Sequence, residues 1–416
     1  MGVMDAQRNI PFSPPDITQA EIDEVVDTLQ SGWITTGPKT KQLECELAAY
    51  TGAGRVACLA SATAALECGL RLLGIGPGDE VITSAYTYTA SASAICHVGA
   101  TPVLCDVAPD SFEMDYDHLP DLVTDKTRAV IPVDIAGRMV DYDRLFKALD
   151  SVSSRWAPGD ERQEALGHLP VLADAAHSLG ARRNGANAGQ VADLTAFSFH
   201  AVKNFTTAEG GALAWREGAF NDDEAYRDVM LMSLHGQTKD ALAKTNANAW
   251  EYDIAFPGWK CNMTDIQAAI GLAQLKRYPE LLARRRVMVG RYEEGLAGSG
   301  VASLRHFEGD PNRAGFASSA HLILVRLIGR SRAFRDELIV RLADAGVATN
   351  VHYKPLPMLT AYRNLGFDIA DFPNALAQFE NEITLPLHTL LSDNDIDYIV
   401  EQFSECKSAL EREGIA

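Results

Sequence analysis

The sequence predicts an α/β protein in which a three-layer large domain, built on a mostly parallel β-sheet, precedes a smaller C-terminal α+β domain. Over the first 275 residues, short apolar runs alternate with segments of helical periodicity, and strands separated by helices form parallel sheets through right-handed crossovers. From about Leu281 onward the pattern changes, because basic residues cluster and a strand-like run lies between amphipathic helices. The 416 residues accommodate both parts, and we expect the large domain over residues 1–275 and the smaller one over 276–416.

The N-terminal segment of the large domain is expected to be helical. Thr18-Gln19-Ala20-Glu21 has the form of a capping box, and apolar residues follow it at helical spacing up to Leu29. Two glycines and a proline within residues 31–38 end this helix. A second helix is expected over residues 39–50.

The rest of the large domain alternates between strand and helix. The strands are expected at residues 56–59, 80–83, 102–106, 129–134, 169–174, 195–199 and 212–215. The helices are expected at residues 62–73, 87–98, 141–149 and 264–277. Residues 151–168 are polar and contain Pro158-Gly159-Asp160, so we interpret them as a surface insertion before the strand that ends at Asp174.

The C-terminal part has its own mixture of elements. Basic residues cluster at Arg284, Arg285 and Arg286, and a strand-like run follows at residues 321–327. An amphipathic helix around Leu338 and a final helix after Asp395 complete the pattern. This mixture predicts the smaller α+β domain.

Composition excludes several classes of protein. The net charge of −19 argues against non-specific binding of nucleic acid, and it means that an anionic substrate needs a locally positive site. The seven cysteines are odd in number and lack Cys-x-x-Cys spacing, which favours reduced thiols in the cytoplasm and no metal site. The N-terminus has no signal-peptide pattern, and the uncharged residues 84–105 are too rich in Ser, Thr, Gly and Tyr for a membrane span.

Two residues indicate the chemistry. Lys203 follows Ser198 and His200 in a polar turn after a predicted strand, and Asp174 ends an earlier strand. This pairing is typical of a pyridoxal-phosphate (PLP) site, where the lysine holds the cofactor as a Schiff base and the aspartate keeps the pyridine nitrogen protonated. The alternatives are a solvated lysine and an aspartate that caps the next helix. Ligands bind at the carboxyl ends of parallel strands, which favours the PLP interpretation and amino-group chemistry.

Neighbouring residues fit the same cofactor. Ser61-Ala62-Thr63 opens a helix, whose free N–H groups and dipole bind phosphate, and Ser198 can add a hydroxyl; the alternative is an ordinary serine N-cap. Tyr88 can stack on the pyridine ring, with core packing or a role for Tyr86 instead as the alternatives. His177 can reach the phenolic oxygen of the cofactor, unless it is a structural histidine.

Together these residues resemble the DegT/StrS-type nucleotide-sugar aminotransferases, which have PLP-transferase fold type I. The resemblance runs along nearly the full length of the chain. Its motifs are SGWITTGP at 31–38, SATAAL at 61–66, GIGPGDEVIT at 74–83, ADAAHSLGA at 173–181, SFHAVKNFTTAEGG at 198–211 and PGWKCNMTDIQAAIGLAQL at 257–275.

The resemblance implies a homodimer in which each active site borrows residues from the partner chain. Lys203 and Asp174 would be catalytic. The cofactor-binding residues would be Ala62, Thr63, Tyr88, Asp174, His177, Ser198, Lys203 and Lys260. We further expect substrate contacts from Thr35, His200 and His352.

The chain departs from the family pattern at three places, one of which is the segment of residues 151–168, which exceeds the usual length. Many members have Asn-Tyr-Arg where this chain has Lys260-Cys261-Asn262, and that asparagine binds phosphate across the dimer. Lys260 would take over as a cationic phosphate ligand, as in members that resemble the aminoarabinose-forming enzymes. Ala208 stands where many members have glycine.

The expected reaction is transfer of an amino group from an amino acid, with glutamate as the expected donor, to a keto group on a nucleotide-linked sugar. The sequence around His200 looks most like that of members that act at the sugar's 4-position. One alternative is a PLP-dependent ketosugar dehydratase, although related dehydratases lack the Schiff-base lysine. Another is a non-catalytic regulator that binds PLP or sugar, although the Lys203–Asp174 pair is intact and no DNA-binding module is appended.

Overall fold

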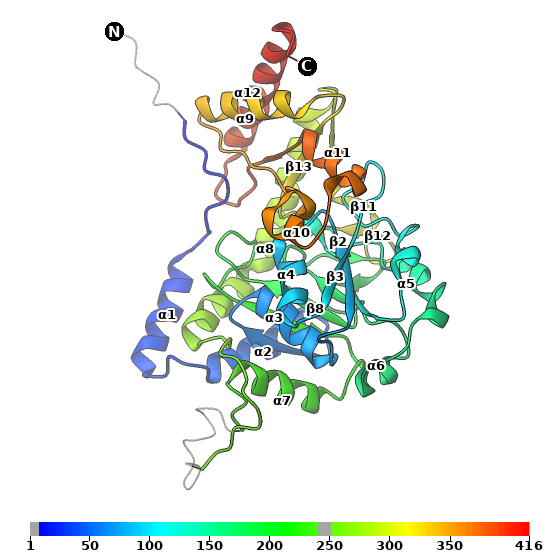
Figure 1. Cartoon of the computed structure of the whole chain (residues 1–416). Coiled ribbons are helices and arrows are strands. Elements are labelled where there is room, and N and C mark those ends of the chain that lie inside the picture. Colours follow the sequence, from blue (N-terminus) through cyan, green and yellow to red (C-terminus); the bar gives the residue numbers. More distant parts are fainter. Residues whose placement is uncertain (1–7, 239–250, 416) are drawn as a thin grey trace.

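A seven-stranded sheet lies at the centre of the large domain in the computed structural model, which describes residues 8–238 and 251–415 (Figure 1). Its strands, in spatial order, are β3 (Thr101–Cys105), β2 (Glu80–Ser84), β4 (Thr127–Ile131), β5 (Leu172–Asp174), β8 (Leu194–Ser198), β9 (Gly211–Trp215) and β1 (Arg55–Leu59). Parallel bridges from Val130 to Val171 and from Val133 to Asp174 join its two halves. Only β9 runs antiparallel to its neighbours, so the prediction of a mostly parallel sheet is confirmed.

The two faces of this sheet carry separate apolar layers. Side chains alternate along a strand: in β1, Val56 and Cys58 join one buried cluster, whereas Ala57 and Leu59 join the other. The helices around the sheet are α2 (Pro38–Thr51), α3 (Ala62–Leu72), α4 (Thr89–His97), α5 (Tyr142–Asp150), α7 (Asp222–Ser233) and α8 (Asp265–Leu296). Residues of α2, α5 and α8 contribute to the first cluster, and residues of α3, α4 and α7 contribute to the second, which gives the three layers.

Most predicted elements of the large domain occur with bounds that differ by a few residues. The N-terminal helix α1 (Gln19–Ser31) begins with a complete capping box at Thr18 and packs along α8. The helix predicted at 264–277 is the clearest correction, because α8 continues through Pro279 to Leu296. Its first half packs in the large-domain core, whereas Met288, Val289 and Tyr292 pack in the C-terminal core. Packing at both ends sustains a helix that the proline would otherwise interrupt.

The C-terminal part is an antiparallel sheet covered by helices. Its strands are β10 (Val301–Ser303), β13 (Ile323–Leu327) and β14 (Glu382–Leu385). Its helices are α9 (Arg332–Asp344), α10 (Thr360–Asn364), α11 (Pro373–Asn381) and α12 (Asp393–Arg412). The division proposed between residues 275 and 276 falls inside α8, and the N-terminal residue Ile10 belongs to the C-terminal core.

Two smaller features complete the fold. A four-stranded sheet is formed by β6 (Arg182–Arg183), β7 (Ala186–Asn187), β11 (Phe307–Asp310) and β12 (Ala314–Ala317). Residues 151–168 contain the short helix α6 (Glu161–Leu166), in which buried Gln163 donates to the carbonyl of Leu73 at 2.7 Å. The insertion therefore caps the end of α3. No helix in the described parts of the chain is long and apolar enough to cross a bilayer.

Candidate active site

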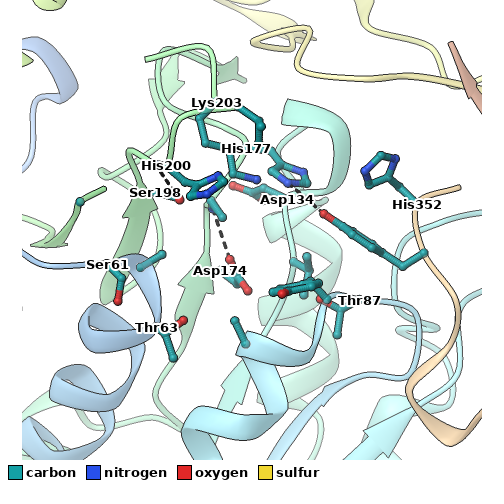
Figure 2. A pocket seen from close by; sticks show the side chains of 18 of the residues that line it. Ser61, Thr63, Thr87, Asp134, Asp174, His177, Ser198, His200, Lys203 and His352 are labelled. Atoms are coloured by element: carbon teal, nitrogen blue, oxygen red, sulfur yellow. Dashed lines mark hydrogen bonds between the residues drawn. The ribbon is translucent and has the colours of Figure 1, made fainter. Parts of the chain in front are cut away.

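A cavity of about 350 Å³ lies at the carboxyl ends of the central strands. Figure 2 shows side chains from several separate segments converging on it. Among its lining residues are Ala62, Thr63, Tyr88, Asp174, His177, Ser198, His200, Lys203 and His352. These are all of the predicted site residues except Thr35 and Lys260.

Asp174, the last residue of β5, is held by two donors. Its Oδ2 accepts a hydrogen bond from Ser91 Oγ at 2.7 Å, and its Oδ1 accepts one from the backbone N–H of Ala176 at 3.3 Å. Ser91 is also bonded to Thr87 Oγ1 at 2.9 Å. Burial raises the pKa of the Asp174 carboxyl, whereas these donors and the charge of Lys203 oppose the rise. The carboxyl group therefore has a fixed orientation inside the cavity.

Lys203 lies in the connection between β8 and β9. Its backbone N–H donates to the carbonyl of His200 at 2.9 Å, and the same connection is closed by the bond from Thr207 N–H to Phe199 O. Burial lowers the pKa of the Lys203 amine to about 8, although the charge of Asp174 opposes this shift. A large fraction of the amine is therefore neutral near pH 8, which suits a nucleophile and a proton carrier.

The start of α3 forms one wall of the cavity. Ser61 is the N-cap and accepts from the backbone N–H of Ala64 at 3.1 Å. Ala62 and Thr63 occupy the first turn, where N–H groups have no partner within the helix. Gly211 allows this arrangement, because a Cβ atom there would lie 2.4 Å from Ala62 N. The wall can bind an anionic group through backbone donors and the helix dipole.

Two of the predicted histidines are neutral, of which His177 is buried and His352 is partly buried. The pKa of His177 lies well below its usual value because of burial and the nearby positive charge of Lys203. Burial and Lys203 likewise lower the pKa of His352 to about 3, and its Nδ1 lies 2.9 Å from Thr384 Oγ1. His200 is more exposed and lies 3.6 Å from the Glu209 carboxylate at the cavity.

Sequence reasoning missed Asp134 and Tyr353. Asp134 is buried and accepts from Ser178 Oγ at 2.6 Å and from the N–H of Val140 at 2.9 Å; burial is the main cause that raises its pKa to about 7. Asp134 follows β4. Its position in a predicted strand is the sequence signal that could have identified it. Tyr353 approaches the cavity from the C-terminal part and is bonded to His177 at 3.1 Å. The sequence pattern indicates only its neighbour His352.

Thr35 and Lys260 lie outside the residues that line the cavity. Both are exposed, and their segments are joined by the hydrogen bond from Asn262 Nδ2 to Thr36 Oγ1 at 2.6 Å. The Lys260 amine is hydrogen-bonded to Asn262 Oδ1. The two residues thus belong to one surface of this chain, separate from its own cavity.

Comparison with known proteins identifies the family. Residues 15–404 match the model of the DegT/DnrJ/EryC1/StrS aminotransferase family. The spore coat polysaccharide biosynthesis protein SpsC of Bacillus subtilis is 37% identical over 397 residues, which cover 94% of this chain and 95% of SpsC.

Solved structures agree with this assignment. The PLP form of Spr1654, a candidate sugar aminotransferase from Streptococcus pneumoniae, has a TM-score of 0.92 and 53% identity over 97% of this chain and 99% of that chain. PseC of Helicobacter pylori, an aminotransferase involved in the biosynthesis of pseudoaminic acid, has a TM-score of 0.82 and 25% identity over 97% of this chain and 100% of that chain. The protein therefore belongs to the DegT/DnrJ/EryC1/StrS aminotransferase family.

Proposed function

We propose that this protein, a PLP-dependent sugar aminotransferase, transfers an amino group from glutamate to the 4-keto position of a nucleotide-linked sugar. The observation that carries the proposal is the pairing of Lys203, whose pKa is lowered to about 8, with buried Asp174 in one cavity. Family membership supports transfer of an amino group. SpsC takes part in polysaccharide biosynthesis and PseC in that of pseudoaminic acid, which supports a sugar as the acceptor.

The residues of the cavity suit PLP. The first turn of α3, with Ala62 and Thr63, offers backbone donors to a phosphate, and Ser198 adds a hydroxyl. The buried Asp174 carboxyl suits a protonated pyridine nitrogen, and Tyr88 offers a flat ring. When bound, the cofactor supplies an electron-withdrawing ring that makes the carbon next to the amino group acidic.

Lys203 and Asp174 have distinct tasks in this proposal. The neutral Lys203 amine would be the nucleophile that holds the cofactor. The same amine would also accept the proton of the donor's α-carbon, as a lysine with a lowered pKa can do. Asp174, oriented by Ser91 and the N–H of Ala176, keeps a positive charge on the pyridine nitrogen.

We infer that the working unit is a homodimer with composite sites. An apolar groove runs between α1 and α8 and reaches Ala201, two residues before Lys203. It includes exposed Ile22 and Val26 on α1. A second copy of the chain would cover this face and bring Thr35 and Lys260 to the neighbouring cavity. The seven free cysteines support a cytoplasmic location.

The test of function uses purified enzyme reconstituted with PLP. Glutamate alone should bleach the visible absorption of the holoenzyme and release 2-oxoglutarate. The bleached enzyme is then mixed with nucleotide-linked 4-keto sugars, nucleotide-linked 3-keto sugars and a ketone that is not a sugar. Only a 4-keto sugar should restore the absorption. The structural match to 3-amino-5-hydroxybenzoic acid synthase at 25% identity makes the last control necessary. Restoration by the non-sugar ketone alone would refute the sugar substrate.

A further inference from the structure

Tyr353 is fixed in the cavity wall by the segment that carries it. The N–H of His352 donates to Glu382 Oε2, and Tyr86 Oη donates to the carbonyl of His352, both at 2.9 Å. Beyond Tyr353, the N–H of Leu356 donates to the carbonyl of Ala85 at 2.9 Å. The segment is thus hydrogen-bonded on both sides of Tyr353. Two of these bonds come from the large domain, in which residue 86 donates and residue 85 accepts.

The tautomer of His177 follows from its backbone partner. The N–H of Ala136 donates to His177 Nδ1 at 3.1 Å, so this nitrogen carries a lone pair and no proton. Burial and the positive charge of Lys203 hold the pKa of His177 well below its usual value, so the ring is neutral. A neutral imidazole with a bare Nδ1 has its proton on Nε2. His177 is therefore the donor in the 3.1 Å hydrogen bond to Tyr353 Oη.

This polarity determines what the Tyr353 hydroxyl can do. Its oxygen already accepts from His177, so its own proton must be directed to another acceptor. Burial and the negative charge of Asp174 raise the pKa of Tyr353, so the hydroxyl keeps that proton. His177 is the hydrogen-bond partner of this hydroxyl among the described residues. Because Tyr353 lines the cavity, the acceptor is expected on the bound molecule.

We propose that Tyr353 donates a hydrogen bond to an electron-rich oxygen of the molecule bound in the cavity, and that His177 acts behind it as a positioning residue. The oxygen belongs either to the ring hydroxyl of the cofactor or to the sugar substrate. This inference rests on the proposed function. It also changes the expected role of His177, whose Nε2 is used by Tyr353 rather than by the cofactor directly.

The first experiment reads the cofactor without any substrate. The visible absorption of the PLP holoenzyme is titrated with pH in the wild type and in Tyr353→Phe. A hydrogen-bond donor to the ionised ring oxygen stabilises the deprotonated form of the bound cofactor. Loss of the Tyr353 hydroxyl should therefore move the midpoint of the titration upward by about one pH unit. Tyr398→Phe is the matched control, because it removes a tyrosine hydroxyl that donates to the carbonyl of Ala345 and does not line the cavity. Its midpoint should not move.

The second experiment separates the two possible acceptors. If the Tyr353→Phe midpoint equals that of the wild type, single-turnover rates are compared for the glutamate half-reaction and the ketosugar half-reaction. A loss of about tenfold or more confined to the ketosugar half would assign the bond to a substrate oxygen. Unchanged midpoint and unchanged half-reactions would overturn the proposal. A wild type that forms no visible band with PLP would instead refute the proposed function.

A double-mutant cycle tests the role of His177. His177→Leu removes the donor behind Tyr353, so it should move the same readout in the same direction as Tyr353→Phe. The double mutant should add little, because both changes act through one hydroxyl. Additive effects would mean that His177 contacts the bound molecule itself. If Tyr353→Phe does not fold, His177→Leu alone still tests the proposal, since an unchanged titration and unchanged half-reactions in that variant would overturn it.

Discussion

Ser91→Ala should shift the acid limb of the pH–rate profile to higher pH. Ser91 and Asp174 are both buried, and their 2.7 Å hydrogen bond holds the carboxyl oxygen Oδ2. A hydrogen bond to a charged group contributes about 1.5–3 kcal/mol, which corresponds to about one to two pKa units. Because Ser91 lowers the pKa of Asp174 and burial raises it, losing the serine hydroxyl raises that pKa further.

The direction of the effect on activity follows from the negative charge that Asp174 carries in the proposed function. The carboxylate is active above its pKa and is lost as the pH falls through it, so a raised pKa makes the loss begin at higher pH. The assay is kcat/KM for the glutamate half-reaction as a function of pH at saturating PLP. Ser91→Thr should keep the wild-type profile, since it retains a hydroxyl.

Ser93→Ala is the matched control, because Ser93 lies on the same helix and its hydroxyl bonds to the carbonyl of Ala90. It should leave the acid limb in place. Thermal melting should first establish that Ser91→Ala is folded. If its acid limb then coincides with that of the wild type, the reasoning is refuted. The hydrogen bond would then be structural and would not tune Asp174.

Four further outcomes are expected. Lys203→Ala should abolish turnover while leaving the fold intact. In the wild-type apoenzyme, the rate of covalent PLP attachment should rise as the pH passes about 8. Borohydride reduction that labels another lysine would contradict the assignment of Lys203. Asp174→Asn should retain PLP but lose most activity, because an amide cannot stabilise a protonated pyridine; near-normal rates would make Asp174 a helix cap. Ala208→Gly should raise the stability by about 1 kcal/mol in thermal melts, because Ala208 has a left-handed φ of 68°; a lower melting temperature would contradict it. Lys260→Ala should weaken PLP binding, and mixed dimers with Lys203→Ala chains should regain one active site; no recovery above either parent would exclude a cross-subunit role.

The fold was largely predictable because its signals are local. The capping box at Thr18 and the alternation of apolar residues in β1 depend on neighbours in the sequence. The full length of α8 was not predictable from such signals, because its second half is held by a core that includes the distant residue Ile10. Pro279 would by itself suggest a helix end.

The residues of the site also fall into those that the sequence predicts and those that only the fold reveals. Lys203, Asp174 and the serine at the start of α3 have recognisable sequence contexts, and the structure brings them to one cavity. Ser91 and Tyr353 have no such recognisable sequence context. Ser91 lies in a stretch rich in small hydroxyl residues, and only the fold selects the one that reaches Asp174. Tyr353 reaches His177 only after the C-terminal segment closes over the large domain.

The charges around the cavity support the proposal that a second chain completes the site. Lys203 is the one lysine or arginine among the described residues that line it, and it is needed for the cofactor. Asp134, Asp174 and Glu209 also line the cavity, and the chain as a whole carries a net charge of −19. A nucleotide-linked sugar adds phosphates to the phosphate of PLP, and such anions bind well only beside positive groups. In the proposed homodimer, exposed Lys260, which lies outside this cavity but beside the Thr35 segment, would supply that charge to the second copy of the chain.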